Sequence, residues 1–149
     1  VVLTGPADHQ ISTLELVKDS LAGKILIDVT VPLVPPKVGT VQMPPEGSAG
    51  KRAQDFLGEE VRVVSAFQNI AAHLLQQDVT IECDVLVTGN DKESRQRVID
   101  MIGEAGMTGW HAGPIANAAA AESLTSILIQ INRSGGISHS GIKIIGQEH

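Results

Sequence analysis

The chain has 149 residues and a formal net charge of −6, and 42% of its residues are hydrophobic, which is enough for one domain with its own core. An acidic balance without clustered Lys and Arg excludes a nucleic-acid surface, and no apolar run reaches the roughly 18 residues of a membrane span. The single cysteine, Cys83, excludes an internal disulfide and a cysteine-based metal cluster, and it favours a reducing cytoplasm.

The first fifty residues predict a strand, a helix, a second strand and a long loop. Apolar strands cover residues 1–6 and 24–29, and Asp8 and Gly23 are suited to begin and end the helix between them. This helix is expected to present one broad apolar face, made of Ile11, Leu14, Leu16, Val17 and Leu21. Residues 32–50 hold five of the seven prolines and three glycines, so we expect a mobile loop that lines a functional cleft.

The middle of the chain alternates helix and strand patterns with short links, which is typical of a parallel α/β sheet. The expected elements are a helix that starts at Ser48 and ends at Leu57, a strand over 61–67, a helix or turn over 71–76, a strand over 83–88 and a helix over 91–106. Asp91 is suited to cap the last helix, and its inward positions are Val98, Met101 and Ile102.

The last third predicts a short strand and turn over 107–115 and then a helix over 117–133. This helix is apolar on nearly every side, so we expect it to be buried all round, within the subunit or against another copy. The tail over 141–146 has the pattern of an edge strand.

Together these elements predict an α/β fold with a Rossmann-like parallel sheet. No GxGxxG loop occurs, so we expect the sheet to be incomplete: residues 1–115 form the second half of an NADP-binding domain, and residues 116–149 form a C-terminal helical segment with the short edge strand. In a doubly wound sheet the strand over 1–4 lies beside the missing first strand, and an unpaired apolar edge of this kind favours association.

The segment from Val63 to Ala72 is the most informative one. It is a β-branched strand that runs into the polar pair Gln68 and Asn69 and then into small residues. In open α/β sheets, ligands bind outside the carboxyl ends of the strands, where this pair is expected. Taken alone the pair is weak evidence, because polar residues after a strand commonly form turns.

The remaining polar residues favour no other chemistry. The histidines show no metal-ligand spacing, and His73 and His111 are better interpreted as surface or hydrogen-bonded side chains. Glu122 lies early in the last helix, where it serves the helix dipole as readily as a catalytic step. Asp28 is either a buried, paired carboxylate or a residue at the end of its strand, and the sequence does not decide between them.

Four blocks of sequence, residues 24–33, 65–70, 84–91 and 112–117, resemble the NADPH-dependent reductases of coenzyme F-420 in order and spacing. The resemblance spans almost the whole chain but only the family's second half, because the glycine-rich loop and the basic pocket for the 2′-phosphate of NADP have no counterpart. It implies an oxidoreductase that transfers a hydride between NADP(H) and the deazaflavin F-420. The chain is then expected to be the C-terminal portion of that enzyme.

The resemblance also implies a set of cofactor-binding residues. The turn from Gln68 to Ala72 would border the nicotinamide, with the backbone of Ile70 and Ala72 suited to its carboxamide; some relatives have His at the position of Gln68 and Pro at that of Ala71. The end of the second strand would line the cleft, and the start of the last helix would meet the deazaflavin. The full set is Thr30, Val31, Pro32, Phe67, Gln68, Asn69, Ile70, Ala71, Ala72, Pro114, Ala116 and Asn117.

Two other functions stay open. One is a non-catalytic interaction domain that keeps the sheet and forms oligomers through the last helix. The other is an NADP-dependent reductase that uses flavin or a metal as acceptor. For either enzyme the expected partners are small-molecule cofactors and a second copy or the missing N-terminal half, with no nucleic acid, no membrane and no bound metal.

Overall fold

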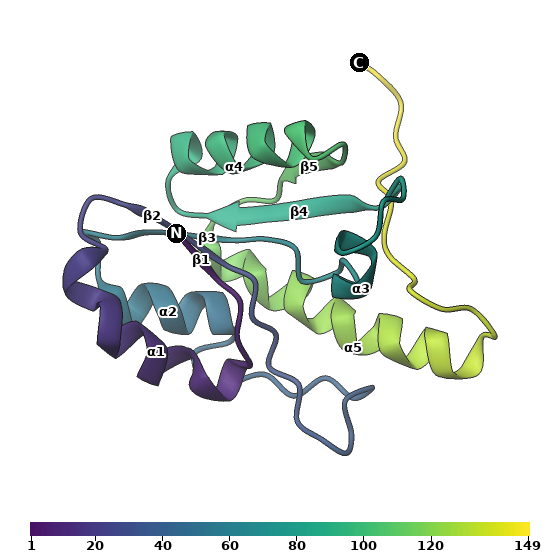
Figure 1. Cartoon of the computed structure of the whole chain (residues 1–149), viewed down its shortest axis with the longest axis horizontal. Helices are drawn as coiled ribbons and strands as arrows, with labels where there is room; N and C mark the ends of the chain where they lie inside the picture. Colours follow the sequence, from purple (N-terminus) through teal and green to yellow (C-terminus); the bar gives the residue numbers. More distant parts are fainter.

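The computed structural model describes residues 1–149 and shows a five-stranded sheet with helices on both faces (Figure 1). The strands are β1 (Val2–Leu3), β2 (Ile25–Asp28), β3 (Arg62–Ser65), β4 (Asp84–Gly89) and β5 (Thr108–His111), and their order across the sheet follows the chain. The predicted α/β class is confirmed.

The direction of β4 differs from the expectation of a wholly parallel sheet. β1, β2 and β3 are parallel to one another, β4 is antiparallel to β3, and β5 is parallel to β4. The link from β3 to β4 contains only the four-residue α3 (Ala72–Leu75), which is too short to cross the sheet as a parallel connection requires. The chain therefore turns back at the same end of the sheet.

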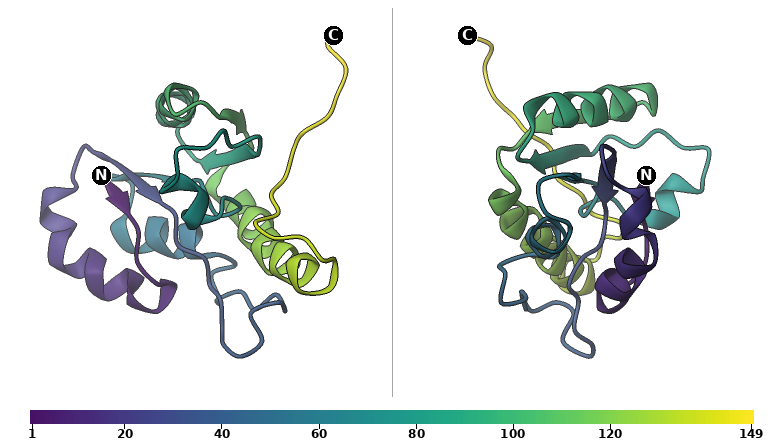
Figure 2. Two further views of the ribbon diagram at one scale, coloured as in Figure 1. Left: turned by 45° about the vertical axis from the view of Figure 1, so that its right-hand side comes forward. Right: turned by 90° about the vertical axis from the view of Figure 1, so that its left-hand side faces the viewer.

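The other helices are α1 (Gln10–Val17), α2 (Ala49–Leu57), α4 (Lys92–Glu104) and α5 (Ala118–Ser134), with 3-10 turns η1 (Ala7–His9), η2 (Lys18–Ser20) and η3 (Ile115–Asn117). Helices α1, α2 and α5 cover one face of the sheet and α4 the other, as the views of Figures 1 and 2 show. Two core clusters result. Alternate residues of a strand point to opposite faces, so Leu26 and Val63 enter the first cluster and Ile27 and Val64 the second.

The predicted helix starts at Ser48 and Asp91 are confirmed. The Ser48 hydroxyl accepts a hydrogen bond from the Lys51 amide at 2.9 Å, and the Asp91 carboxylate accepts one from the Ser94 amide at 2.8 Å. Each bond satisfies an amide that a helix start leaves without an intrahelical partner.

The predicted inward faces are wrong at several positions. Leu16 is 86% exposed and Met101 is 38% exposed, although Leu14 and Ile102 on the same helices are fully buried. Each of these helices contacts the sheet along only a narrow stripe of its own surface, so neighbouring apolar residues outside the stripe stay exposed. Within the chain α5 is not buried all round either, because Ile127 and Ile131 lie on its outer side and are 47% and 40% exposed. None of the helices is long and apolar enough to cross a membrane.

The predicted edge strand over 141–146 is also wrong. The Ile142 carbonyl accepts a hydrogen bond from the Asp84 amide at 2.8 Å, which begins a pairing with β4. The next donor, the Ile144 amide, binds the Asp84 carboxylate instead of the backbone, and the Trp110 indole N–H donates to the same oxygen. The side chain of Asp84 therefore ends the ladder after one bond.

We expect Ile102→Ala to lower the free energy of unfolding by about 3 kcal/mol, because it opens a cavity between α4 and the sheet. The neighbouring change Met101→Ala should cost less than about 1 kcal/mol, since this side chain is partly exposed. Denaturant unfolding measures both. Equal losses would contradict the burial of these two residues.

Candidate functional site

The turn after β3 carries an unusual backbone conformation. Phe67 has φ of 71°, in the left-handed region that bulky side chains rarely adopt. Such residues persist where the surrounding structure holds them, and they are enriched at functional sites. The turn lies outside the carboxyl ends of β2 and β3, where the sequence places the ligand site.

The side chains of Gln68 and Asn69 hold this turn in place. The Gln68 amide N–H group donates to the Asp28 carbonyl at 2.9 Å and to the Ser65 hydroxyl at 2.8 Å, and the Asn69 amide donates to the Ala121 carbonyl at 2.9 Å. Both side chains are buried. They therefore anchor the turn to β2 and to α5, a role that their position after a strand did not predict.

One acceptor in this turn has no partner. The Gln68 Oε1 atom is buried and receives no hydrogen bond. A buried acceptor without a donor costs about 1–3 kcal/mol, so a ligand N–H group that reached it would recover that loss.

Thr125 is a residue of the site that the sequence analysis missed. Its hydroxyl donates to the Gln68 carbonyl at 2.7 Å and accepts from the Asn69 amide at 3.2 Å. Thr125 lies on α5, three positions after Glu122. This spacing places both residues on the same side of the helix and is the signal that the sequence did contain.

An apolar hollow of about 540 Å³ opens beside the turn. Five of the predicted residues line it: Val31, Phe67, Gln68, Ile70 and Ala72. The other lining residues are Val2, Thr4, Val29, Leu75, Met101, Ala105 and Met107. Its size and apolar walls are those of a site for a small organic ligand, and its walls suit a flat ring.

The hollow exists because one face of the sheet is only partly covered. Helix α4 packs on β3, β4 and β5, whereas no helix of the chain covers the same face of β1 and β2. β1 pairs with β2 on one side only, as the sequence-based strand order leads us to expect.

Three predicted residues at the end of β2 and in the turn lie beside the hollow rather than in it. Thr30 is 2% exposed, and its amide donates to the Asp28 carboxylate at 2.9 Å. Pro32 lines a separate hollow of about 350 Å³ with Asp8 and Arg52, and Ala71 borders a cavity of about 120 Å³ against α5.

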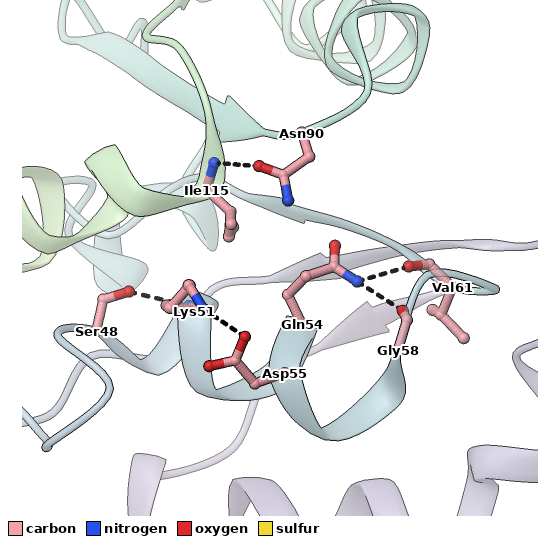
Figure 3. A network of polar contacts seen from close by, with 8 residues as sticks. All are labelled: Ser48, Lys51, Gln54, Asp55, Gly58, Val61, Asn90 and Ile115. Carbon is pink, nitrogen blue, oxygen red and sulfur yellow. Dashed lines mark hydrogen bonds and ion pairs between the residues drawn. The ribbon is translucent and has the colours of Figure 1, made fainter.

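The structure does not bring Pro114, Ala116 and Asn117 to the turn. None of the three lines the apolar hollow. Because β4 runs antiparallel to β3 with Gly89 opposite Val64, the segment after β5 leaves the sheet beside β3 and next to Asn90, to which the Ile115 amide donates (Figure 3). Within this chain the two sets of predicted residues therefore do not line one cleft.

A polar hollow of about 580 Å³ lies at the amino end of β3. Gln54 donates to the Gly58 and Val61 carbonyls at 2.8 and 2.9 Å and fixes its floor (Figure 3). Its charged residues are Asp55, Glu59, Asp91 and Arg62, so carboxylates outnumber the one guanidinium. This sign of charge disfavours the phosphates of a dinucleotide.

A buried polar network lies under the site. Asp28 accepts from the Gln10 amide at 2.6 Å, and Gln10 in turn donates to the Ala49 carbonyl and accepts from the Arg52 guanidinium. The Glu122 carboxylate accepts from the Ala49 and Gly50 amides at 2.6 and 3.1 Å. The sequence left the state of Asp28 undecided, and the structure shows a buried carboxyl with hydrogen-bond partners.

Burial dominates the protonation of both carboxyls. It raises the pKa of Glu122 to about 7, against the lowering effect of the Gly50 and Ala49 hydrogen bonds. Burial also raises the pKa of Asp28, against hydrogen bonds from Thr30 and Gln10 and the charge of Arg52.

The fold and site define an α/β domain with a mostly parallel sheet and an apolar hollow at the carboxyl ends of β1 to β3. The chain is 34% identical over 153 residues to the F420-dependent NADP reductase of Methanocaldococcus jannaschii, which covers 99% of this chain and 68% of that protein. It is 34% identical to the reductase of the same name from Methanothermobacter thermautotrophicus, over 97% of this chain and 65% of the relative. The chain belongs to the F420-dependent NADP reductase family.

Solved structures agree with this fold. A crystal structure from Arthrobacter sp. FB24, provisionally named as an F420-dependent NADP reductase, matches with a TM-score of 0.83 and 26% identity over 98% of this chain and 68% of that one. A hypothetical protein from Sinorhizobium meliloti shares the fold, with a TM-score of 0.65 over 80% of this chain and 58% of that one. No family model matches. The chain spans about two thirds of the length of the curated relatives.

We expect the stability of the protein to fall as pH rises through the neutral range. The pKa of Glu122 is about 7 in the fold against an ordinary 4.5, so between these values the folded state binds more protons than the unfolded state. The free energy of unfolding should therefore drop by up to about 3 kcal/mol between about pH 5 and pH 8. Asp28 contributes with the same sign.

Denaturant unfolding across this pH range checks the prediction. Glu122→Gln should flatten most of the slope, whereas the exposed Glu104→Gln should leave it unchanged. A wild-type stability that stays level or rises with pH would show that Glu122 is not a buried carboxyl with a raised pKa.

Proposed function

We propose that this chain is the C-terminal portion of an enzyme that transfers a hydride between NADP(H) and the deazaflavin coenzyme F-420. The observation that carries the proposal is the apolar hollow beside the strained turn at Phe67, in a chain whose relatives are named F420-dependent NADP reductases. The two cofactors supply the hydride chemistry when they are bound, and the protein's task is to orient them and exclude water.

The residues of the turn suit a nicotinamide. The free acceptor of Gln68 matches the amide N–H donor of a carboxamide, and the small side chains of Ala71 and Ala72 let the backbone approach a ring closely. The apolar lining from Val31, Ile70 and Met107 excludes water from the reacting faces. No side chain of the hollow is ionised, which is consistent with a transfer that needs positioning rather than a catalytic acid.

The position of the second ring is a separate proposal. None of Pro114, Ala116 and Asn117 lines the apolar hollow, so we propose that the deazaflavin stacks on the nicotinamide within the hollow and contacts its apolar lining from Val29 and Met107 instead. Hydride transfer needs the two rings face to face, so both rings belong in one hollow.

We further propose that additional polypeptide completes the hollow. β1 has a free edge, Val1 and Val2 are 60% and 50% exposed, and the relatives are about half as long again as this chain. A segment that pairs with β1 and covers Val2 and Val29 would also carry the glycine-rich phosphate loop that this chain lacks. The single free cysteine is consistent with a cytoplasmic enzyme.

Self-association through α5 is the second candidate role. Ile127 and Ile131 form an exposed apolar stripe on its outer side. A homo-oligomer built on this stripe is compatible with the proposed enzyme activity. If the chain has no such activity, self-association would make it a non-catalytic interaction domain.

We expect NADPH affinity and deazaflavin reduction to appear together when this chain is co-expressed with the N-terminal third of the Methanocaldococcus jannaschii reductase. The phosphate loop and the turn at 68–72 hold opposite ends of one dinucleotide, so neither half should bind it tightly alone. Calorimetry and the absorbance of the deazaflavin measure the two activities. A complex that forms but gains neither activity would contradict the proposed function.

Ala72→Leu should weaken NADPH binding about tenfold in the assembled enzyme, because it adds bulk in the hollow while its exposed position spares the fold. Ala22→Leu, on an exposed turn at the far end of β2, is the matched control and should leave the affinity unchanged. If both variants bind NADPH equally well, the turn does not border the nicotinamide.

A further inference from the structure

The loop between β2 and α2 lies against α5 on one side and faces η1 and α2 across a small hollow on the other. Its only polar contacts from Val34 to Gly47 lie within the loop, such as those from Gln42 to the Val34 and Lys37 carbonyls. Its middle lies against α5, where a Cβ atom on Gly39 would stand 2.9 Å from Gln130 Oε1. Its end is held by Glu122, eight residues or about 12 Å earlier on the same helix.

The attachment at Glu122 is specific. Ala49 and Gly50 begin α2, so their amides lack intrahelical acceptors, and the two oxygens of one carboxylate satisfy both. The Glu122 side chain is fully buried, and Gly50 packs so closely on Ala118 and Ser65 that an added Cβ would lie 3.1–3.2 Å from them. The start of α2 cannot move without breaking these bonds.

The same junction reaches the candidate cleft. Gln10 joins the Ala49 carbonyl to the Asp28 carboxylate, and Asp28 binds the Thr30 amide through its side chain and Gln68 through its carbonyl. A shift of Ala49 is therefore transmitted to the end of β2 and to the turn that carries the unpartnered Gln68 oxygen.

We propose that Glu122 is a positioning residue that fixes the 34–47 loop and, through Ala49, Gln10 and Asp28, the walls of the cofactor cleft. The loop half of this inference, that Glu122 fixes residues 34–47, is independent of the proposed function. The cleft half, that Glu122 also positions the walls of the cofactor cleft, rests on the proposed function. The charged groups of the junction are Glu122 on α5, Asp28 on β2 and Arg52 on α2.

Hydrogen exchange of the full chain, read by mass spectrometry, tests the loop half without any cofactor. In Glu122→Gln one amide loses its acceptor and faces an NH2 group, so peptides from 34–50 should exchange about tenfold faster, while peptides from α4 keep their rate. Glu104→Gln should change neither. Unaltered exchange over 34–50 would overturn the inference.

If Glu122→Gln does not fold, the unmodified chain gives the same answer. The measured exchange is first corrected for the pH dependence of the intrinsic amide exchange rates. Opening of 34–50 should then increase as pH rises from about 6 to about 8. The pKa of Glu122 is raised because burial disfavours its ionised form, so ionisation favours the open state in which the carboxylate is hydrated. Protection that is independent of pH over this range would overturn the inference.

Kinetics of the assembled enzyme test the cleft half. Glu122→Gln should raise KM for the cofactors about tenfold with kcat changed less than about threefold, and it should remove the pH dependence of KM near neutrality. Faster loop exchange with an unchanged KM would overturn the positioning role. An inactive wild-type assembly would instead refute the proposed function, and hydrogen exchange would still decide whether Glu122 holds the loop.

Discussion

Asp28 is the point on which the arrangement of this end of the molecule depends. Its carbonyl and its two carboxylate oxygens receive hydrogen bonds from Gln68, Gln10 and Thr30, which belong to the turn after β3, to α1 and to the end of β2. One residue at the end of a buried strand thus joins its own strand end to two segments that are distant in the sequence. The chain gains a defined position for its turn, and the cost is the desolvation of a carboxyl group.

A second carboxyl, Glu122, adds to that cost. Both groups are buried, and the charge of Asp28 adds to the rise in the pKa of Glu122, with Arg52 as the one cation of the network. A hydrophobic packing of the same volume would often be as stable or more so. The polar junction is therefore better explained by the precise placement of α2, α5 and the turn than by stability.

The elements that the sequence predicted well are those whose signals are local. Ser48 and Asp91 cap helices through bonds to residues three positions later. The prolines and glycines predicted a loop over 32–50, which the structure shows up to Ser48, where α2 begins. Both signals are local. The turn at Gln68 was located by the pattern of its own strand.

The elements that were predicted wrongly depend on distant partners. No local residue encodes that β4 turns back along β3, and this single reversal moves Pro114 to Asn117 away from the turn. The buried pairing of Glu122 with Ala49 joins residues that are 73 positions apart, and the exposure of Leu16 and Met101 is set by which part of the sheet each helix covers. In each case the deciding contact is made with a distant part of the chain, and the local hydrophobic pattern does not reveal it.

The proposed function places the two cofactors at the turn after β3 and not beside Pro114 to Asn117. The most direct measurement is an amide NMR titration of the labelled chain in its assembled enzyme with a deazaflavin and, separately, with NADPH. Both ligands are expected to shift the amides of Phe67 to Ala72, and the deazaflavin is also expected to shift those of Val29 and Met107. Shifts confined to Pro114–Asn117 and Asn90, with the turn unaffected, would contradict this placement.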